Sequence, residues 1–294
     1  MRSQSDRLLS LDFESMTSFS NTHSRYLLDF FADQVDSNIQ NNLVSELMTR
    51  YAGLSRQLEE KNELLNTYNE QLEELVREKV KEITSSQVAT IHALVKSAES
   101  RDDDTGAHIE RTAGYCRLIA EKLFEDKLYA DIVDRDFIDN IEMASPLHDI
   151  GKVGIEDAIL LKPGQLTFEE FEIMKTHVTK GYETLASVES VYHENAFLKL
   201  GMEISRYHHE KWDGRGYMSG LSGEDIPLSA RIMALSDVYD ALRSKRVYKE
   251  PFSHEKTLGI ITDGRGLHFD PVLVDVFMKH HSLFEEVFDR LSNN

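Results

Sequence analysis

A long heptad repeat is the feature that most restricts how this chain can fold. Apolar residues recur at every seventh position from Val44 to Leu72, and a second series, interrupted by one lysine, runs from Leu47 to Leu75. Glutamate, glutamine, lysine and arginine fill most of the positions between them. Such a narrow apolar stripe predicts a coiled coil over residues 44–87 that links and dimerises the protein, with a stutter after Leu75. The alternative is one long helix that lies along its own domain.

The sequence after this repeat also predicts helices. Apolar residues in the stretch 109–123 follow a helical spacing that includes Cys116, so we expect this cysteine in a core and not as a nucleophile. Thr167 and Glu170 predict a capping box at the start of the helix that carries His177. Because no stretch alternates as a strand does, we expect an all-α domain over residues 88–294.

Composition limits the classes of partner and the compartment. The chain has 294 residues and a formal net charge of −19, which argues against polymeric nucleic acid and anionic membranes as partners. One cysteine cannot form an intrachain disulfide and fits a reducing compartment. Without a signal pattern or a membrane-length apolar run, the protein is expected in the cytoplasm. Residues 1–43 form a short N-terminal segment, helical or sensory, whose role the sequence does not indicate.

Histidines and aspartates recur with spacings that suit metal binding. The pairs Asp104 with His108 and His208 with His209 can each share one helix, and the neighbours His148 and Asp149 can share two ions. Two further residues, His177 and Asp237, come from separate predicted helices. Nitrogen and oxygen donors together suit iron, manganese or zinc, and the lack of a thiolate argues against a structural zinc site.

The remaining histidines are expected to have ordinary surface or capping roles. A lone histidine is more often structural than a ligand, and the same holds for the neighbouring pair close to the C-terminus. These residues are His23, His92, His193, His254, His268, His280 and His281.

Taken with their flanking residues, these motifs resemble the HD-GYP family, a branch of the HD-domain metal phosphohydrolases. The resemblance covers roughly residues 90–285. It implies an HD-domain-like helical bundle, preceded here by the long coiled-coil helix, that hydrolyses cyclic di-GMP to pGpG and on to GMP. It also implies a diguanylate cyclase (GGDEF) protein as a partner. The matching stretches are Glu99–His108, His148–Ile155, Lys162–Leu166, Met174–His177, His208–Tyr217 and Asp237–Lys249.

The resemblance assigns a role to each of these site residues. It implies two or three divalent ions, iron or manganese, with Asp149 as the bridging carboxylate and Asp104 as the ligand of a third ion. Lys152 would bind phosphate and protonate the leaving oxygen. The implied metal ligands are Asp104, His108, His148, Asp149, His177, His208, His209 and Asp237. The implied substrate-binding residues are Lys152, Asp213, Tyr217, Arg246 and Lys249.

One departure from the family pattern leaves alternatives open. The Gly-Tyr-Pro motif that gives the family its name is Gly216-Tyr217-Met218 in this chain. Methionine in place of proline restores a backbone N–H and frees φ at the third position. The ligands are unchanged, so we expect the chemistry to survive. The alternatives are a cyclic dinucleotide sensor of weak or no activity that signals through its coiled coil, and a hydrolase of 3′,3′-cyclic GMP–AMP. Product analysis with both dinucleotides would distinguish them.

Overall fold

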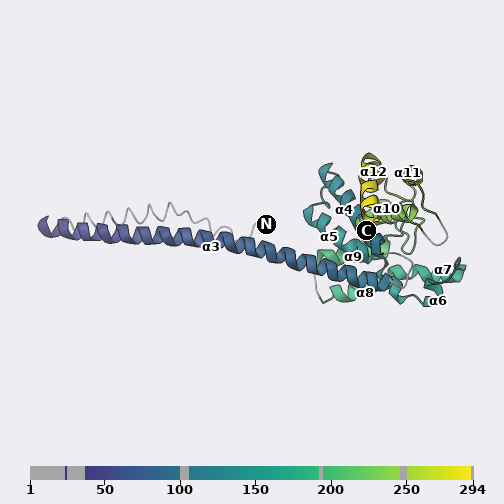
Figure 1. Cartoon of the computed structure of the whole chain (residues 1–294), viewed down its shortest axis with the longest axis horizontal. Coiled ribbons are helices and arrows are strands. Elements are labelled where there is room, and N and C mark those ends of the chain that lie inside the picture. Colours follow the sequence, from purple (N-terminus) through teal and green to yellow (C-terminus); the bar gives the residue numbers. More distant parts are fainter. Residues whose placement is uncertain (1–23, 25–36, 100–105, 192–194, 246–249, 293–294) are drawn as a thin grey trace. The chain divides into compact units, whose positions relative to one another are not determined.

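The computed structural model describes residues 24, 37–99, 106–191, 195–245 and 250–292. Its contacts divide the chain into two units, Met1–Glu82 and Ile83–Asn294. The long helix α3 (Ser37–Glu99) runs from the first unit into the second (Figure 1). The domain boundaries expected from the sequence, at residues 43 and 87, stay predictions.

In the first unit, α3 carries the heptad stripe on its surface. Stripe residues are exposed, for example Leu54 at 66% and Leu65 at 57%. A single helix of this length therefore leaves its apolar stripe in water. Pairing with a second helix in a coiled coil would bury that stripe. The predicted helix is confirmed, and its pairing with a second helix stays a prediction.

The second unit is built from helices that follow one another through short loops. The predicted all-α class is confirmed for the described residues, which contain no strand and one isolated bridge between Arg265 and Phe269. After α3 the elements are α4 (Gly106–Glu125), α5 (Arg135–Ala144), η1 (Ser145–Gly154), α6 (Asp157–Leu160), α7 (Phe168–Lys175), α8 (His177–Glu189), α9 (Ala196–Tyr207), η2 (Gly223–Asp225), α10 (Leu228–Arg243), α11 (His254–Asp263) and α12 (Pro271–Ser292).

The main core lies where α4, α10 and α12 pack on one another (Figure 1). Four fully buried rings interlock there in edge-to-face and stacked pairs, namely Tyr115, Tyr239, Phe277 and Phe284. Cys116 belongs to the same core at 0% exposure, as its helical spacing predicted. A smaller cluster joins Val95, near the end of α3, to Ile109 and Leu147, so the last turns of α3 belong to this unit.

Two glycines allow η1, α8 and α9 to approach closely. A Cβ on Gly151 would lie 1.9 Å from the carbonyl oxygen of His177, and one on Gly181 would lie 2.2 Å from Oγ of Ser205. No side chain fits at either position. The backbones of η1 and α8 therefore lie in direct contact, and α8 packs closely on Ser205 of α9, just before His208 and His209.

Local details differ from the sequence expectation in two places. The capping box of Thr167 and Glu170 is confirmed, but the helix that it opens, α7, ends at Lys175, and His177 begins the next helix. His208 and His209 follow the last turn of α9 and do not share its body. Within the described residues, no helix combines the length and the apolar character needed to cross a lipid bilayer.

Candidate metal centre

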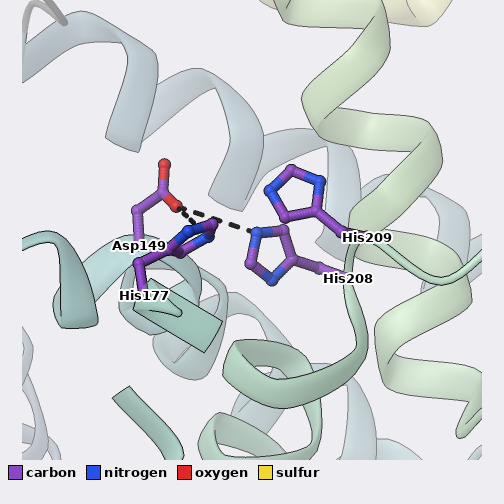
Figure 2. A group of neighbouring side chains, drawn as sticks. All are labelled: Asp149, His177, His208 and His209. Carbon is purple, nitrogen blue, oxygen red and sulfur yellow. Dashed lines mark ion pairs between the residues drawn. The ribbon is translucent and has the colours of Figure 1, made fainter. Parts of the chain in front are cut away.

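Two groups of histidine and aspartate side chains lie next to each other in the second unit. Within each group the ligand atoms lie within 4.8 Å of one another, a spacing compatible with a shared cation. Nε2 of His148 in one group is 3.3 Å from Oδ2 of its neighbour Asp149 in the other. Asp104 lies outside the described residues. The structure thus brings together every described residue of the predicted ligand set. The first group is Asp149, His177, His208 and His209 (Figure 2), and the second is His108, His148 and Asp237.

Different elements supply these side chains. His108 comes from the first turn of α4, Asp237 from the middle of α10, and His177 from the first residue of α8. The two adjacent pairs come from η1 and from the turn after α9. Most of these residues are in the core of the unit, with His148 at 0% exposure and Asp149 at 9%. The site therefore forms only when the whole bundle folds.

Helix-end carbonyls orient three of the imidazoles. Nδ1 of His148 lies 2.9 Å from the carbonyl oxygen of Ser145, and the corresponding contacts of His177 and His208 measure 2.8 and 2.9 Å. A carbonyl can only accept a hydrogen bond, so each Nδ1 carries the ring proton and donates it. Each Nε2 is then the lone-pair nitrogen. This is how proteins fix the tautomer of a metal-binding histidine.

Unsatisfied buried atoms of the first group fit a cation. Oδ1 of Asp149 and Nε2 of both His177 and His208 are buried and have no hydrogen-bond partner among the described residues. The oxygen lies 3.2 Å from the first nitrogen and 3.7 Å from the second. Dashed lines in Figure 2 mark these two pairs. The lone pairs of these atoms face one another and repel. A cation bound between them would stabilise this arrangement. The cluster can hold divalent metal ions.

The electrostatic surroundings keep these ligands in their metal-binding forms. Burial lowers the pKa of His208 well below its usual value, and burial lowers the pKa of His209 to about 4. Burial would raise the pKa of Asp149, but Lys152 and His148 outweigh it and hold that pKa well below its usual range. At neutral pH His208 and His209 are therefore neutral imidazoles and Asp149 is an ionised carboxylate, which are the forms that bind metal ions.

The predicted substrate-binding residues divide into three cases. Nζ of Lys152 lies 2.8 Å from Oδ2 of Asp149, directly beside the first group. Asp213 lies in the loop after α9, where its Oδ1 accepts the backbone N–H of Arg215 at 3.0 Å and shapes a turn. Arg246 and Lys249 lie outside the described residues, and Tyr217 borders the first group.

Tyr217 covers one side of the first group. Its ring stacks on His209 with centroids 4.7 Å apart and an interplanar angle of 26°. Burial raises the pKa of Tyr217, and the negative charges of Asp149 and Asp237 raise it further. The phenol therefore stays protonated and borders the cluster as a neutral ring.

Glu210 holds the loop that carries this tyrosine. The side chain is 2% exposed, and its Oε1 accepts the backbone N–H groups of Ser219 at 2.6 Å and Gly220 at 3.1 Å. A Cβ on Gly216 would lie 2.4 Å from Cα of Glu210, so the loop folds back on the segment after His209 as only a glycine permits. We did not predict a role for Glu210, although its position directly after two ligands is a signal.

A buried carboxylate behind the second group was also missed. Asp240 accepts the Nδ1–H of His108 at 2.8 Å and two hydrogen bonds from Arg111, at 2.6 and 2.8 Å. Arg111 in turn donates to Ser244 at 2.9 Å. The sequence signal for these two residues is their spacing. Asp240 lies three positions after Asp237, and Arg111 lies three positions after His108, so each shares a helix face with a predicted ligand.

The comparison with known families agrees with this geometry. Residues 53–273 match the HD domain family, and the chain belongs to it. Within the HD domain family it belongs to the HD-GYP branch, as its motifs and its relatives agree.

Curated relatives share much of this chain. It is 45% identical to a probable cyclic di-GMP phosphodiesterase of Vibrio cholerae over 232 residues, which is 79% of this chain and 53% of that protein. It is 37% identical to a cyclic di-GMP phosphodiesterase response regulator of Xanthomonas campestris over 247 residues, 84% of this chain and 62% of that one. It is 41% identical to 3′3′-cGAMP-specific phosphodiesterase 2 of Vibrio cholerae over 194 residues, 66% and 35% of the two chains. The chain thus spans about half the length of the curated relatives that it matches.

Proposed function

We propose that this chain is a metal-dependent phosphodiesterase that hydrolyses cyclic di-GMP to pGpG and on to GMP. The observation that carries the proposal is a buried pair of ligand groups joined through His148 and Asp149, whose side chains lie 3.3 Å apart. Two ions held side by side suit the hydrolysis of a phosphodiester. Relatives named as cyclic di-GMP phosphodiesterases support the substrate.

The ligand assignment follows the two groups. We assign His177, His208 and His209 to one ion and His108 with Asp237 to the other, and Asp149 to both. His148 joins the second set, and Asp104 would serve a third ion. Bound ions supply Lewis acidity and lower the pKa of water. We propose iron or manganese, both of which suit imidazole and carboxylate donors.

Lys152 is assigned to the substrate phosphate. Its Nζ is 2.8 Å from Asp149 and its side chain is 20% exposed, so it faces both the cluster and solvent. A cation in this position can bind a phosphate oxygen and stabilise the charge that develops in the transition state. It can also give a proton to the departing 3′ oxygen.

Replacing the shared carboxylate tests the proposal. Asp149→Ala should lose metal and turnover together, because Asp149 is the one residue assigned to both ions. Asp131→Ala, which changes an exposed aspartate, should retain both. Metal content after anaerobic purification and release of pGpG and GMP from cyclic di-GMP are the two measurements. Full activity of Asp149→Ala would refute the scheme.

Relatives named as 3′3′-cGAMP-specific phosphodiesterases favour a second substrate. One of them, phosphodiesterase 2 of Vibrio cholerae, shares 41% identity with this chain. Turnover of 3′,3′-cyclic GMP–AMP at a higher kcat/KM than cyclic di-GMP would select this alternative. Tight binding of either dinucleotide without turnover, in anaerobic buffer with Fe²⁺ or Mn²⁺, would instead select a sensor.

We propose further that α3 pairs with α3 of a second copy through its heptad stripe. Leu58 at 53% and Leu65 at 57% exposure are typical of that stripe. Lysine at both positions should shift the mass measured by light scattering from dimer to monomer. Lysine at Glu63 and Glu70, which lie on the opposite face of the heptad, should leave the dimer intact. A monomeric unmodified chain would refute this pairing.

A further inference from the structure

Helix α7 has no role in the core and yet lies beside the metal centre. It contributes no buried residue, and it ends at Lys175, two positions before the proposed ligand His177. Phe171 on this helix is 45% exposed. Its ring meets Tyr217 edge to face, with centroids 6.2 Å apart. Because Tyr217 stacks on His209, a row of rings leads from the cluster out to α7.

A lysine is held over this row of rings. Nζ of Lys175 lies 5.5 Å from the centroid of Phe171 and 5.7 Å from that of Tyr217. Its side chain is only 16% exposed, and it is paired with Glu172 on the same helix. Two cation–π contacts and an ion pair restrict where the ammonium group can lie. The lysine is therefore held over two aromatic rings, while Phe171 stays 45% exposed to solvent.

We infer that Phe171 and Lys175 form a guanine-base subsite next to the metal centre. Phe171 offers a stacking face to a purine, and Lys175 donates hydrogen bonds to O6 and N7 at the edge of that base. Base–aromatic stacking tolerates any base, because every base has a π face. The edge contact is selective, since guanine presents two acceptors there and adenine presents N7 beside an amino donor.

This inference rests on the proposed function, because it assigns a base of the same substrate. It adds a physical basis for choosing guanine over adenine, which the metal cluster cannot provide. The exposed Phe168, 74% exposed on the same helix, offers an internal comparison. Within the described residues it makes none of the ring contacts that connect Phe171 to the cluster.

Equilibrium binding of GMP and AMP to the Mn²⁺-loaded full chain tests the subsite. Each ligand presents one base and contains no phosphodiester bond to cleave, so calorimetry reports binding alone. The test variants are Phe171→Ala and Lys175→Met. The matched controls are Phe168→Ala, an exposed ring on α7, and Lys180→Met, an exposed lysine on α8. Metal content and thermal melting check that each variant is folded, which we expect of the α7 variants because that helix has no buried residue.

Loss of the ring should weaken GMP and AMP binding alike, by about tenfold. Loss of the lysine should weaken GMP binding about tenfold and AMP binding less than twofold, so the preference for GMP falls. Both controls should bind as the unmodified chain does. Unchanged GMP affinity in Phe171→Ala, equal losses for both nucleotides in Lys175→Met, or no GMP binding by the unmodified chain would each overturn the inference.

Turnover of cyclic di-GMP by the unmodified chain is measured separately. Absence of turnover would refute the proposed function even where GMP binding follows the expected pattern. Turnover with unaltered KM in Phe171→Ala would refute the subsite and leave the proposed function in place. The two failures are therefore distinguishable.

Discussion

Asp240 and His108 are joined by a 2.8 Å hydrogen bond in which the histidine Nδ1–H donates to the carboxylate. The bond leaves Nε2 of His108 facing the second ligand group, 3.8 Å from Oδ1 of Asp237. Asp240 is 0% exposed and also neutralises Arg111. One buried carboxylate therefore orients the imidazole of His108 and stabilises the buried guanidinium of Arg111.

Asp240→Asn should weaken metal binding and stability together. The amide is a poorer acceptor for His108, and loss of such a partner typically costs ten- to a hundredfold in metal affinity. Arg111 would remain buried without its counter-charge, at a cost of about 3–5 kcal/mol in the free energy of unfolding. Titration with Mn²⁺ and urea unfolding of the metal-free protein measure the two effects.

The control for Asp240→Asn is an ion pair of the same geometry on the surface. Arg265 binds Asp275 through two hydrogen bonds of 2.8 and 2.7 Å, and the carboxylate side chain is 60% exposed. Asp275→Asn should change the free energy of unfolding by less than about 1 kcal/mol and leave metal affinity unchanged. Equal effects of the two substitutions would contradict the orienting role of Asp240.

Gly151→Ala should disrupt the approach of η1 to α8. The added methyl would lie 1.9 Å from a backbone oxygen of His177, so the two elements must separate. We expect a loss of at least about 3 kcal/mol in unfolding free energy and a loss of metal, because both elements carry ligands. Gly259→Ala in α11, where nothing lies within 4 Å of the added carbon, should instead be neutral or stabilise by up to about 1 kcal/mol. Melting temperatures of both variants test the contrast.

The sequence was sufficient to predict which histidines and aspartates gather into the two groups, because residue type indicates metal-binding chemistry. The neighbours His148 and Asp149 indicate a metal site because other histidines and aspartates accompany them along the sequence. The helical spacing around Cys116 likewise predicted a core face, since burial follows the period of the helix. These features depend on residue type and local spacing, both of which one amino-acid sequence shows.

Other features depend on contacts between distant residues and could not be predicted. The carboxylate of Asp240 acts on His108 across 132 positions of sequence, and its one local signal, a position one helical turn after Asp237, does not indicate that partner. The break between α7 and His177 was missed because the sequence around Lys175 continues a helical pattern. The proposed stacking role of Phe171 could not be predicted either, because a single exposed aromatic residue produces no periodic pattern in the sequence.

Cys116 should be inert to thiol reagents while the protein is folded. Its side chain is 0% exposed, and burial raises the pKa of the thiol to about 12. The reactive thiolate is therefore almost absent at pH 8. As the chain contains one cysteine, absorbance from a disulfide reagent should stay at baseline in native buffer and rise to one equivalent in guanidinium. Rapid labelling of the native protein would show that α4 opens without global unfolding.

His268 should make the metal-free protein sensitive to acid. Burial lowers its pKa to about 4, with Lys211 adding to the effect, whereas the unfolded chain titrates near pH 6.5. Between these values only the unfolded state takes up the proton. The stabilisation is therefore complete above pH 6.5 and is lost as pH falls toward 4. Since solvent reaches part of the ring, we expect a contribution of about 2 kcal/mol. Urea unfolding at pH 7.0 and 4.5 should show a smaller loss in His268→Gln than in the unmodified chain, and equal losses would exclude His268 as a source of the acid sensitivity.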